Sequence, residues 1–359
     1  MNLSDAIQLS PSSPNYCLSF FQFLPLLPDY RVRLMKTSLT TTLLTAAFCS
    51  LTASCLWADG KDDLAPTVAA PEETQIPISQ EFTMEGSYTG TSITKQGTAK
   101  LGGVSNINSH FNYVVSPQIK DGLLLRFGVD TERNSFGLFS NAPLPNTLQS
   151  VNAIIGADMS LGDKTIVRVE LHPGIYSDFV DVNGSDFDMP VQIGGTYLFS
   201  KDFQIILGLQ IDLKSNYPII GLPGFRWQFA DKWVLSAIPP KPQLQYELSN
   251  ALTLYAGAEI LGGTYHLNNN FGTNHGHGPA TTNSQFNNNI CDFTELRVGA
   301  GFTWKFMPNL SLDLSGGYMP YREFNLHQDH IGFDTHSTSF KNDIGDGAPY
   351  AEAGISGSF

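Results

Sequence analysis

The sequence predicts an all-β protein, namely a closed antiparallel up-and-down transmembrane β-barrel of about 12 strands, within a range of about 12 to 14. Three observations predict this class: segments that alternate apolar and polar residues, short turns that separate them, and a final alternating strand that ends on an aromatic residue. The composition agrees, because charged residues make up only 15% of the chain while Gly and Phe number 33 and 24. This composition favours strands and turns.

The chain is acidic, with a formal net charge of −13. No cluster of Lys and Arg is visible, and a surface that binds nucleic acid needs one to neutralise phosphates. The charge therefore excludes nucleic acid as a partner, although it does not separate the remaining function classes.

The N-terminal region 1–58 has no features of a folded unit and ends in a targeting segment. From Met35 the chain shows a basic start at Lys36, a Thr-rich apolar stretch and then small residues, which is the layout of a cleavable signal peptide. We place the cleavage most simply after Ala58 and expect Met35 to be the true start. A lipoprotein signal ending at Cys55 is an alternative, but Thr52 is unusual at its position.

Cleavage there leaves Cys291 as the one cysteine of the mature chain, so no intramolecular disulfide can form. We expect a buried structural thiol. Residues 59–80, rich in Pro, Ala and acidic residues, predict a flexible leader, and residues 81–359 predict the barrel.

Alternation with a period of two identifies the strands. In Lys164–His172, four residues of one face are apolar or Thr, whereas Lys164, Arg168, Glu170 and His172 share the other. The same pattern recurs in 205–213, 252–260, 295–305 and 310–315. Several of these segments reach the roughly 9–11 residues that a tilted strand needs to cross a bilayer. One face therefore suits lipid and the other water.

Turn signals separate these segments. They are Leu161–Lys164, Ser200–Asp202, Ala230–Lys232, Ser249–Asn250 and Pro308–Asn309. Longer polar stretches lie between the hairpins, at 141–150, 178–189, 267–292 and 326–346. Short turns at one end and long loops at the other are typical of an outer-membrane barrel.

The last strand alternates from Ala351 to Phe359. It resembles the signal that the barrel-assembly machinery of bacterial outer membranes recognises, which implies that machinery as a partner. Aromatic residues suit the two interfacial girdles of a barrel surrounded by outer-membrane lipids and lipopolysaccharide. They are Trp227, Phe229, Trp233, Trp304, Phe306, Tyr318 and Tyr321.

The strand count depends on two regions. One or two hairpins fit within 82–115, and Pro239, Pro240 and Pro242 interrupt 225–248 and predict a turn. An even number is expected in a bacterial single-chain barrel, and we favour about 12.

Four segments carry a family resemblance. They are Ala142–Gln149, Arg168–Asp178, Gly224–Trp233 and Pro240–Leu248. With these segments, most of 85–359 resembles an uncharacterised bacterial domain-of-unknown-function family of predicted outer-membrane barrels. The resemblance implies the fold and brings no substrate, activity or catalytic residue.

Charged residues on the polar faces are the candidate site. Arg168, Glu170 and His172 share one face and could meet residues of other strands across the lumen. The full set of candidate lumen-facing residues is Arg126, Asp130, Arg168, Glu170, His172, Glu259, Glu295 and Arg297. Such a set can form a constriction that selects ions, or a salt-bridged plug that stabilises a narrow barrel. Both interpretations remain open.

Metal and catalytic sites have weaker support. His275, His277, His327 and His330 lie in polar loops, and Asp178, Asp181, Asp186 and Asp188 could offer oxygen ligands to calcium. Solvated loops explain both sets better, so we expect no metal and no cofactor. Ser177 lies in no nucleophile-elbow setting, and we expect no enzyme.

The sequence thus predicts an exported outer-membrane barrel of a Gram-negative bacterium, acting either as a small channel for polar solutes or as a structural or surface barrel. The alternatives are a barrel enzyme that acts on lipid and a soluble periplasmic β-protein.

Overall fold

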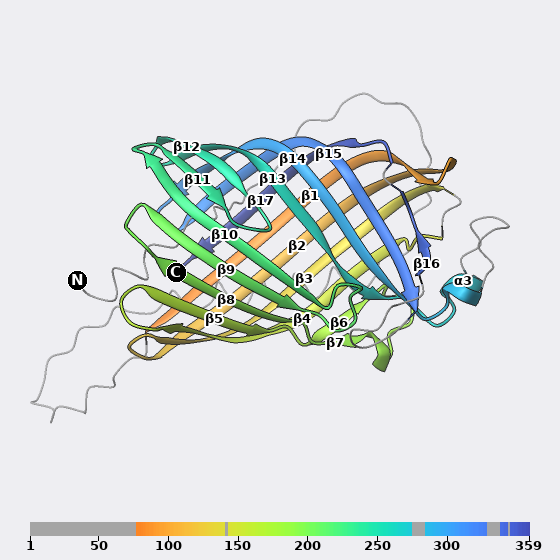
Figure 1. Ribbon diagram of the computed structural model, residues 1–359, viewed down its shortest axis with the longest axis horizontal. Helices are drawn as coiled ribbons and strands as arrows, with labels where there is room; N and C mark the ends of the chain where they lie inside the picture. The colour runs from red at the N-terminus through yellow and green to blue at the C-terminus, as the bar shows by residue number, and fades with distance from the viewer. Residues whose placement is uncertain (1–76, 141–142, 275–283, 329–337, 344) are drawn as a thin grey trace, which may run out of the picture. The chain divides into compact units, whose positions relative to one another are not determined.

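A computed structural model describes residues 77–140, 143–274, 284–328, 338–343 and 345–359, which form one closed sheet (Figure 1). Its strands are β1 (Ile78–Gln96), β2 (Ala99–Lys120), β3 (Leu123–Ser140), β4 (Thr147–Ser160), β5 (Thr165–Leu171), β6 (Gly174–Ser177), β7 (Phe187–Asp188), β8 (Val191–Leu198), β9 (Phe203–Ile211), β10 (Ile219–Ala230), β11 (Trp233–Ala237), β12 (Gln243–Ser249), β13 (Leu252–His266), β14 (Asn289–Met307), β15 (Leu310–Gln328), β16 (Thr338–Lys341) and β17 (Ala348–Ser358). The helices are short: η1 (Gly184–Asp186), α3 (Phe271–Asn274) and η2 (Ser284–Phe286). In the described part of the chain, no helix is long and apolar enough to span a bilayer.

The barrel closes between its first and last strands. β17 pairs with β1 from Glu81↔Ser358 to Thr89↔Tyr350, and with β15 on its other side. Each wall strand runs antiparallel to its neighbours, so the predicted all-β, closed, antiparallel class is confirmed. β1 begins at Ile78, three residues before the predicted boundary at 81. The predicted signal peptide 1–58 and most of the leader 59–80 lie outside the described residues.

The wall has 14 strands, and the favoured number of 12 was therefore too low, although 14 lies within the predicted range. β11 and β12 have only 5 and 7 residues, which is short for a membrane strand. They lie in the region that the prolines interrupt, and the predicted turn there is confirmed by the loop around Pro239 and Pro240. The alternation is too brief in these strands to be counted securely from sequence.

All five predicted turns are confirmed, and they lie at one end of the barrel together with Phe359, whose backbone pairs with Gln80. The C-terminus lies at this end in Figure 1, whereas α3 and β16 lie at the other. We call these the turn end and the loop end. Long loops in outer-membrane barrels face outward from the cell.

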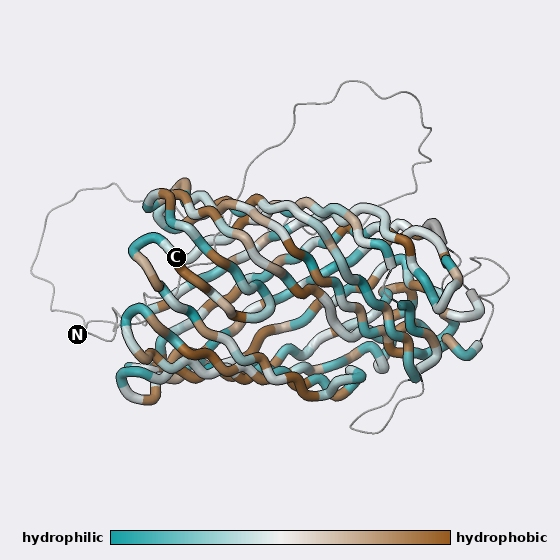
Figure 2. The backbone as a smooth tube through the Cα atoms, turned by 45° about the horizontal axis from the view of Figure 1, so that its top comes forward, coloured by the Kyte–Doolittle hydropathy of each residue, from teal (hydrophilic) through white to brown (hydrophobic). Residues whose placement is uncertain are grey.

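The outer surface is apolar at membrane depth. Ile155, Leu207 and Leu254 are exposed, with 46%, 64% and 41% of their surfaces accessible. Hydrophobic stretches alternate with hydrophilic ones along the strands (Figure 2). Near the turn end, Trp227 packs against Phe229, with ring centroids 5.5 Å apart, and a second aromatic pair, Trp233 and Tyr246, follows at 4.8 Å. This arrangement matches the aromatic girdle of a membrane barrel.

One side of the loop end is filled by a hydrophobic core. Its buried members are Val104, Phe136, Leu144, Leu148, Tyr265, Leu267, Phe271, Phe286, Cys291, Phe293, Phe324, Leu326 and Phe340. Cys291 is fully buried within it, as expected of a structural thiol. The wall strands that contribute are β2, β3, β4, β13, β14 and β15, so the core does not reach β8–β10.

β6 divides the loop end into two parts. It pairs with β4 on one side and, through Ser177↔His266, with β13 on the other, so it links two wall strands that are far apart around the barrel. The buried Asp186–His266 pair, at 2.6 Å, holds the following segment against β13. The core therefore lies between β6 and the wall strands β13, β14, β15, β2, β3 and β4. Strands β8, β9 and β10 lie outside it.

Candidate functional site in the barrel lumen

The first half of the site lies on β3, β4 and β5. Arg126 donates through Nε to Glu170 at 2.5 Å, and Arg126 and Glu170 are 6% and 7% exposed. Arg168 donates two hydrogen bonds of 2.7 Å to the carboxylate of Asp158. Every second residue of a strand lies on the same face, which explains why Arg168 and Glu170 both point inward.

Two histidines carry the network onward. His172 lies 3.5 Å from Glu170 through Nε2 and 3.4 Å from Asn152 through Nδ1. Asn152 donates to Asp130 at 3.2 Å, and Asp130 lies 2.8 Å from His110 on β2. A polar chain therefore runs from β5 across β4 and β3 to β2.

Lys241 joins the two halves. It comes from the proline-rich β11–β12 loop, and its Nζ lies 3.2 Å from Glu85, 2.6 Å from Glu259 and 3.1 Å from Glu352. Glu85 on β1 also lies 3.4 Å from His110. β12 and β1 are separated by four strands around the wall, so Lys241 reaches Glu85 through the interior.

Arg297 is the centre of the second half and is fully buried. Its guanidinium donates to Glu295 at 2.7 Å and to Glu352 at 3.1 Å. It also donates to Ser87 at 2.9 Å and to Thr89 at 3.0 Å. It lies over the ring of Tyr350, 5.2 Å from the centroid. Arg322 on β15 donates to the other oxygen of Glu295 at 2.7 Å.

The structure thus brings all eight predicted residues into one network, although no direct contact joins the Arg168–Glu170 group to the Glu295–Arg297 group. We call the network the charged belt. It comprises Arg126, Asp130, Asp158, Arg168, Glu170, His172, Asn152, His110, Glu85, Lys241, Glu259, Glu352, Arg297, Glu295 and Arg322. Its carboxylates outnumber its Lys and Arg side chains by seven to five.

The sequence analysis did not identify several residues of the charged belt. Glu85, Glu352 and Arg322 lie on the polar faces of strands, so alternation alone could have found them. Lys241 could not be found this way, because it lies in a turn whose path into the lumen depends on the fold. His110 sits in β2, in the region where the number of hairpins was left open.

The belt does not continue onto β8, β9 and β10. Arg168 pairs with Gly194, which pairs with Gly208, which pairs with Leu222, so these positions face the lumen. Along the inward positions of this wall, the one charged residue is Arg226 near the turn end. An added Cβ at Gly194 meets no atom within 4 Å. The lumen therefore has a charged wall and, opposite it, a wall whose inward residues are almost all uncharged, namely Gly, Ile, Leu, Gln and Thr.

In the part of the chain that the structure describes, no group of three or more His, Cys, Asp or Glu side chains could hold a metal ion. His327 lies 3.3 Å from Asp292, whereas His275, His277 and His330 lie outside the described residues. Asp178 accepts from Asn268, and Ser177 is buried and accepts from the backbone of Phe179. Each of these last two groups thus serves local structure.

The loop between β9 and β10 carries one perturbed carboxyl. Burial and the neighbouring Asp188 carboxylate raise the pKa of Asp212 to about 7. Asp212 accepts from the backbone of Lys214 at 3.0 Å, so this carboxyl organises the loop.

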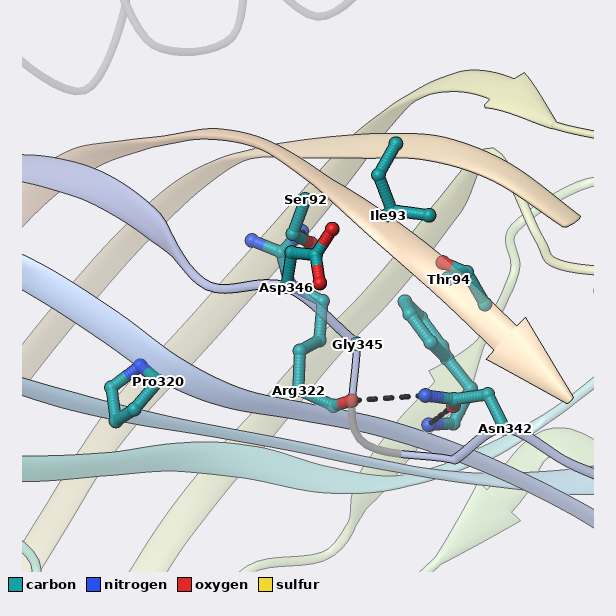
Figure 3. A pocket seen from close by; sticks show the side chains of 9 residues that line it. Ser92, Ile93, Thr94, Pro320, Arg322, Asn342, Gly345 and Asp346 are labelled. Carbon is teal, nitrogen blue, oxygen red and sulfur yellow. Dashed lines mark hydrogen bonds between the residues drawn. The ribbon is translucent and has the colours of Figure 1, made fainter. Parts of the chain in front are cut away.

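A small pocket lies between β1, β15 and the residues Asn342, Gly345 and Asp346, and Figure 3 shows Ser92, Arg322 and Asn342 around it. The side chain of Asn342 donates to the carbonyl of Arg322 at 3.0 Å. Because the Arg322 side chain is engaged with Glu295 and with the Val104 carbonyl, we assign no ligand to this pocket.

The chain matches one family model and has low-scoring structural similarity to several solved outer-membrane proteins. The family model described as "Domain of unknown function (DUF6268)" matches residues 135–356. Similar solved structures include an outer membrane channel (COG4313) from Pseudomonas putida F1, with 11% identity, a TM-score of 0.39 and coverage of 82% of this chain and 100% of that one. A bacterial polysaccharide outer membrane secretin has 11% identity, a TM-score of 0.36 and coverages of 78% and 98%. The NanC porin has 9% identity, a TM-score of 0.33 and coverage of 77% of this chain and 98% of that one. No curated protein matches the chain significantly.

Proposed function

The chain belongs to the family of the DUF6268 domain, and we propose that it is a non-enzymatic outer-membrane channel for small solutes, with a path along the wall β8–β10 past the charged belt. The observation that carries the proposal is the two-sided lumen. A barrel of about eight strands is just filled by its own side chains, whereas this wall has 14 strands, and an added Cβ at the inward-facing Gly194 meets no atom within 4 Å. A purely structural barrel has no need of that space.

The proposed location rests on the outer surface. Exposed apolar side chains and a girdle near the turn end suit lipid, and they disfavour the alternative of a soluble periplasmic protein. Export through the signal peptide and assembly through the strand ending in Phe359 belong to this proposal, with outer-membrane lipids and lipopolysaccharide as the surroundings.

Two adjacent glycines allow a matched test. Gly194 faces the lumen with open space around it, whereas Gly195 faces outward, and the nearest atom to its added Cβ is 4.0 Å away. We expect purified wild-type protein to conduct ions in planar bilayers and to prefer cations, since carboxylates dominate the belt. Gly194→Trp should lower the conductance by more than half, and Gly195→Trp should leave it unchanged.

Folding of each variant is checked by the different gel migration of heated and unheated samples. Absence of conductance from folded wild-type protein would refute the channel and favour a structural barrel. Equal conductance of the two tryptophan variants would refute the path along β8–β10.

A further inference from the structure

One stretch of the barrel wall lacks its hydrogen-bond ladder. β11 pairs with β10 only from Phe225 to Ala230, and β12 pairs with β13 only from Leu252 to Gly257. The turn between them adds two bonds, from Ala258 to the Pro242 carbonyl and from Ile260 to the Pro240 carbonyl, both 3.0 Å. Figure 1 shows this short hairpin ending well before β10 and β13 do.

Beyond the hairpin, β10 and β13 have unpaired facing edges. The backbone groups of even-numbered residues of β10 bond to β9, because the backbone N–H of Asp212 donates to the Pro218 carbonyl and the register continues along β10. In an antiparallel ladder the odd-numbered residues then direct their backbone groups to the other side. Ile219, Gly221 and Pro223 therefore face β13. Even-numbered residues of β13 face the same gap, and these include Gly262 and Thr264. Within the described residues, none of these five backbones has a hydrogen-bond partner across the gap. We call this break the lateral window.

The window lies at membrane depth. Five residues of β10, from Ile219 to Pro223, span about 14 Å along the strand. Counted from the girdle residue Trp227, with a strand tilt of about 40°, they lie about 10 to 20 Å above the girdle, within the apolar band of about 25 Å. Because the girdle marks the turn end, the window opens onto the outer half of the bilayer.

An open ladder in hydrocarbon is costly, because each unsatisfied backbone group loses several kcal/mol. Irregular backbone at this depth is tolerated where it lines a water-containing cavity or is covered by protein. Pro223 reduces the cost, since it has no N–H to leave unpaired, and proline is confined to such free edges in sheets. The sequence is therefore adapted to an unpaired edge here.

The top of the window is held by the β9–β10 loop. The backbone N–H of Asn216 donates to Asp292 at 2.9 Å, and Thr264 donates to the other oxygen of Asp292 at 2.8 Å. Lys214 donates to the carbonyl of Phe187 at 2.9 Å. These contacts keep β10 and β13 in a fixed relation although no ladder joins them.

The residues on the membrane side and on the lumen side of the window indicate which class of molecule could pass through it. Outside, Ile219 and Ile260 are 49% and 50% exposed at its edges. Inside, Ile220 and Leu222 of β10 face the lumen beside it, next to Gln210 and Gly208 of β9, and Ile220 is 40% exposed although it points inward. An apolar strip therefore continues from the membrane face to the wall of the lumen that the charged belt leaves free.

We propose that the lateral window is a port through which small apolar or amphipathic molecules pass between the outer-leaflet hydrocarbon and the lumen. The inference rests on the proposed channel function and names its solute class. The hydrophobic core closes the direct route through the side of the loop end that is formed by β13, β14, β15, β2, β3 and β4, so the window offers such molecules a route that avoids the core and enters the lumen beside the β8–β10 wall.

Gly221 provides the test, because it is exposed at the window edge and its added Cβ meets no atom within 4 Å. Gly221→Trp should fill the window without disturbing packing. Gly195→Trp is the matched control, since Gly195 also faces lipid but is paired on both sides, with Val167 and Leu207. The probe is the apolar dye 1-N-phenylnaphthylamine, whose fluorescence rises as it crosses the outer membrane of intact cells.

We expect wild-type protein to raise the rate of dye uptake several-fold over cells lacking it, Gly221→Trp to return the rate to that background, and Gly195→Trp to behave as wild type. Ion conductance of Gly221→Trp should remain, because the Gly194 path is intact. If Gly221→Trp assembles poorly, Gly221→Cys labelled with a bulky maleimide after assembly replaces it, with Gly195→Cys as its control.

Unchanged uptake in blocked protein would overturn the port, and so would wild-type protein that conducts ions without admitting dye; in both cases the channel stands. If folded wild-type protein shows neither ion conductance nor dye uptake, both the channel and the port are refuted. Spontaneous disulfide-linked dimers of Gly221→Cys would overturn the port in favour of an edge that pairs with a second copy of the chain.

Discussion

Replacing Arg297 by Met tests the energetics of the charged belt. Arg297 is fully buried and donates to Glu295 and Glu352, at 2.7 and 3.1 Å. Met keeps much of the volume but removes the charge, so both carboxylates lose a partner inside the barrel. Breaking a buried ion pair from one side costs about 3–5 kcal/mol. We therefore expect Arg297→Met to lower the free energy of unfolding by about that amount.

The assay is urea unfolding of the folded barrel in lipid vesicles, followed by tryptophan fluorescence. With a urea m-value of about 3 kcal/mol/M, the midpoint should fall by about 1 to 2 M. Arg168→Met is the matched control, because the Arg168 side chain is 47% exposed and its pair with Asp158 is screened by water. Such a pair contributes about 1 kcal/mol or less. Equal midpoint shifts for the two variants would refute the argument that burial sets the cost.

Three further outcomes follow from named contacts. Deleting Phe359 removes its stacking on Phe82, at 6.4 Å, and two backbone bonds to Gln80, so the heat-modifiable fraction in the outer membrane should fall several-fold; Phe359→Tyr should keep it. The pKa of Asp212 is raised to about 7, so its stabilisation of the β9–β10 loop is complete at low pH and is lost as the pH rises through 7. Amide exchange in that loop, corrected for intrinsic rates, should be faster at about pH 8 than at about pH 5, and Asp212→Asn should abolish the difference. Cys291 is fully buried, so maleimide should modify it only after unfolding; rapid labelling of the folded barrel would contradict the core packing.

The sequence by itself determined the fold class, because a period of two reports directly which residues of a strand share a face. Thr165, Val167 and Val169 share one face of β5, and Arg168 and Glu170 share the other, from which both enter the charged belt. The five turns could also be predicted from the sequence, since their Gly, Asn, Asp and Pro residues favour turn conformations whatever surrounds them.

The tertiary structure alone decided how these faces meet. Lys241 enters the belt because a proline-rich turn brings it opposite Glu85, and no pattern along the chain reports a contact across 156 residues. The same holds for β6, whose pairing with both β4 and β13 separates the core from the wall β8–β10. The lateral window exists because two strands, β11 and β12, end early. Alternation records where a side chain points, whereas strand pairing, the reach of a side chain and the absence of a neighbour depend on closure of the barrel.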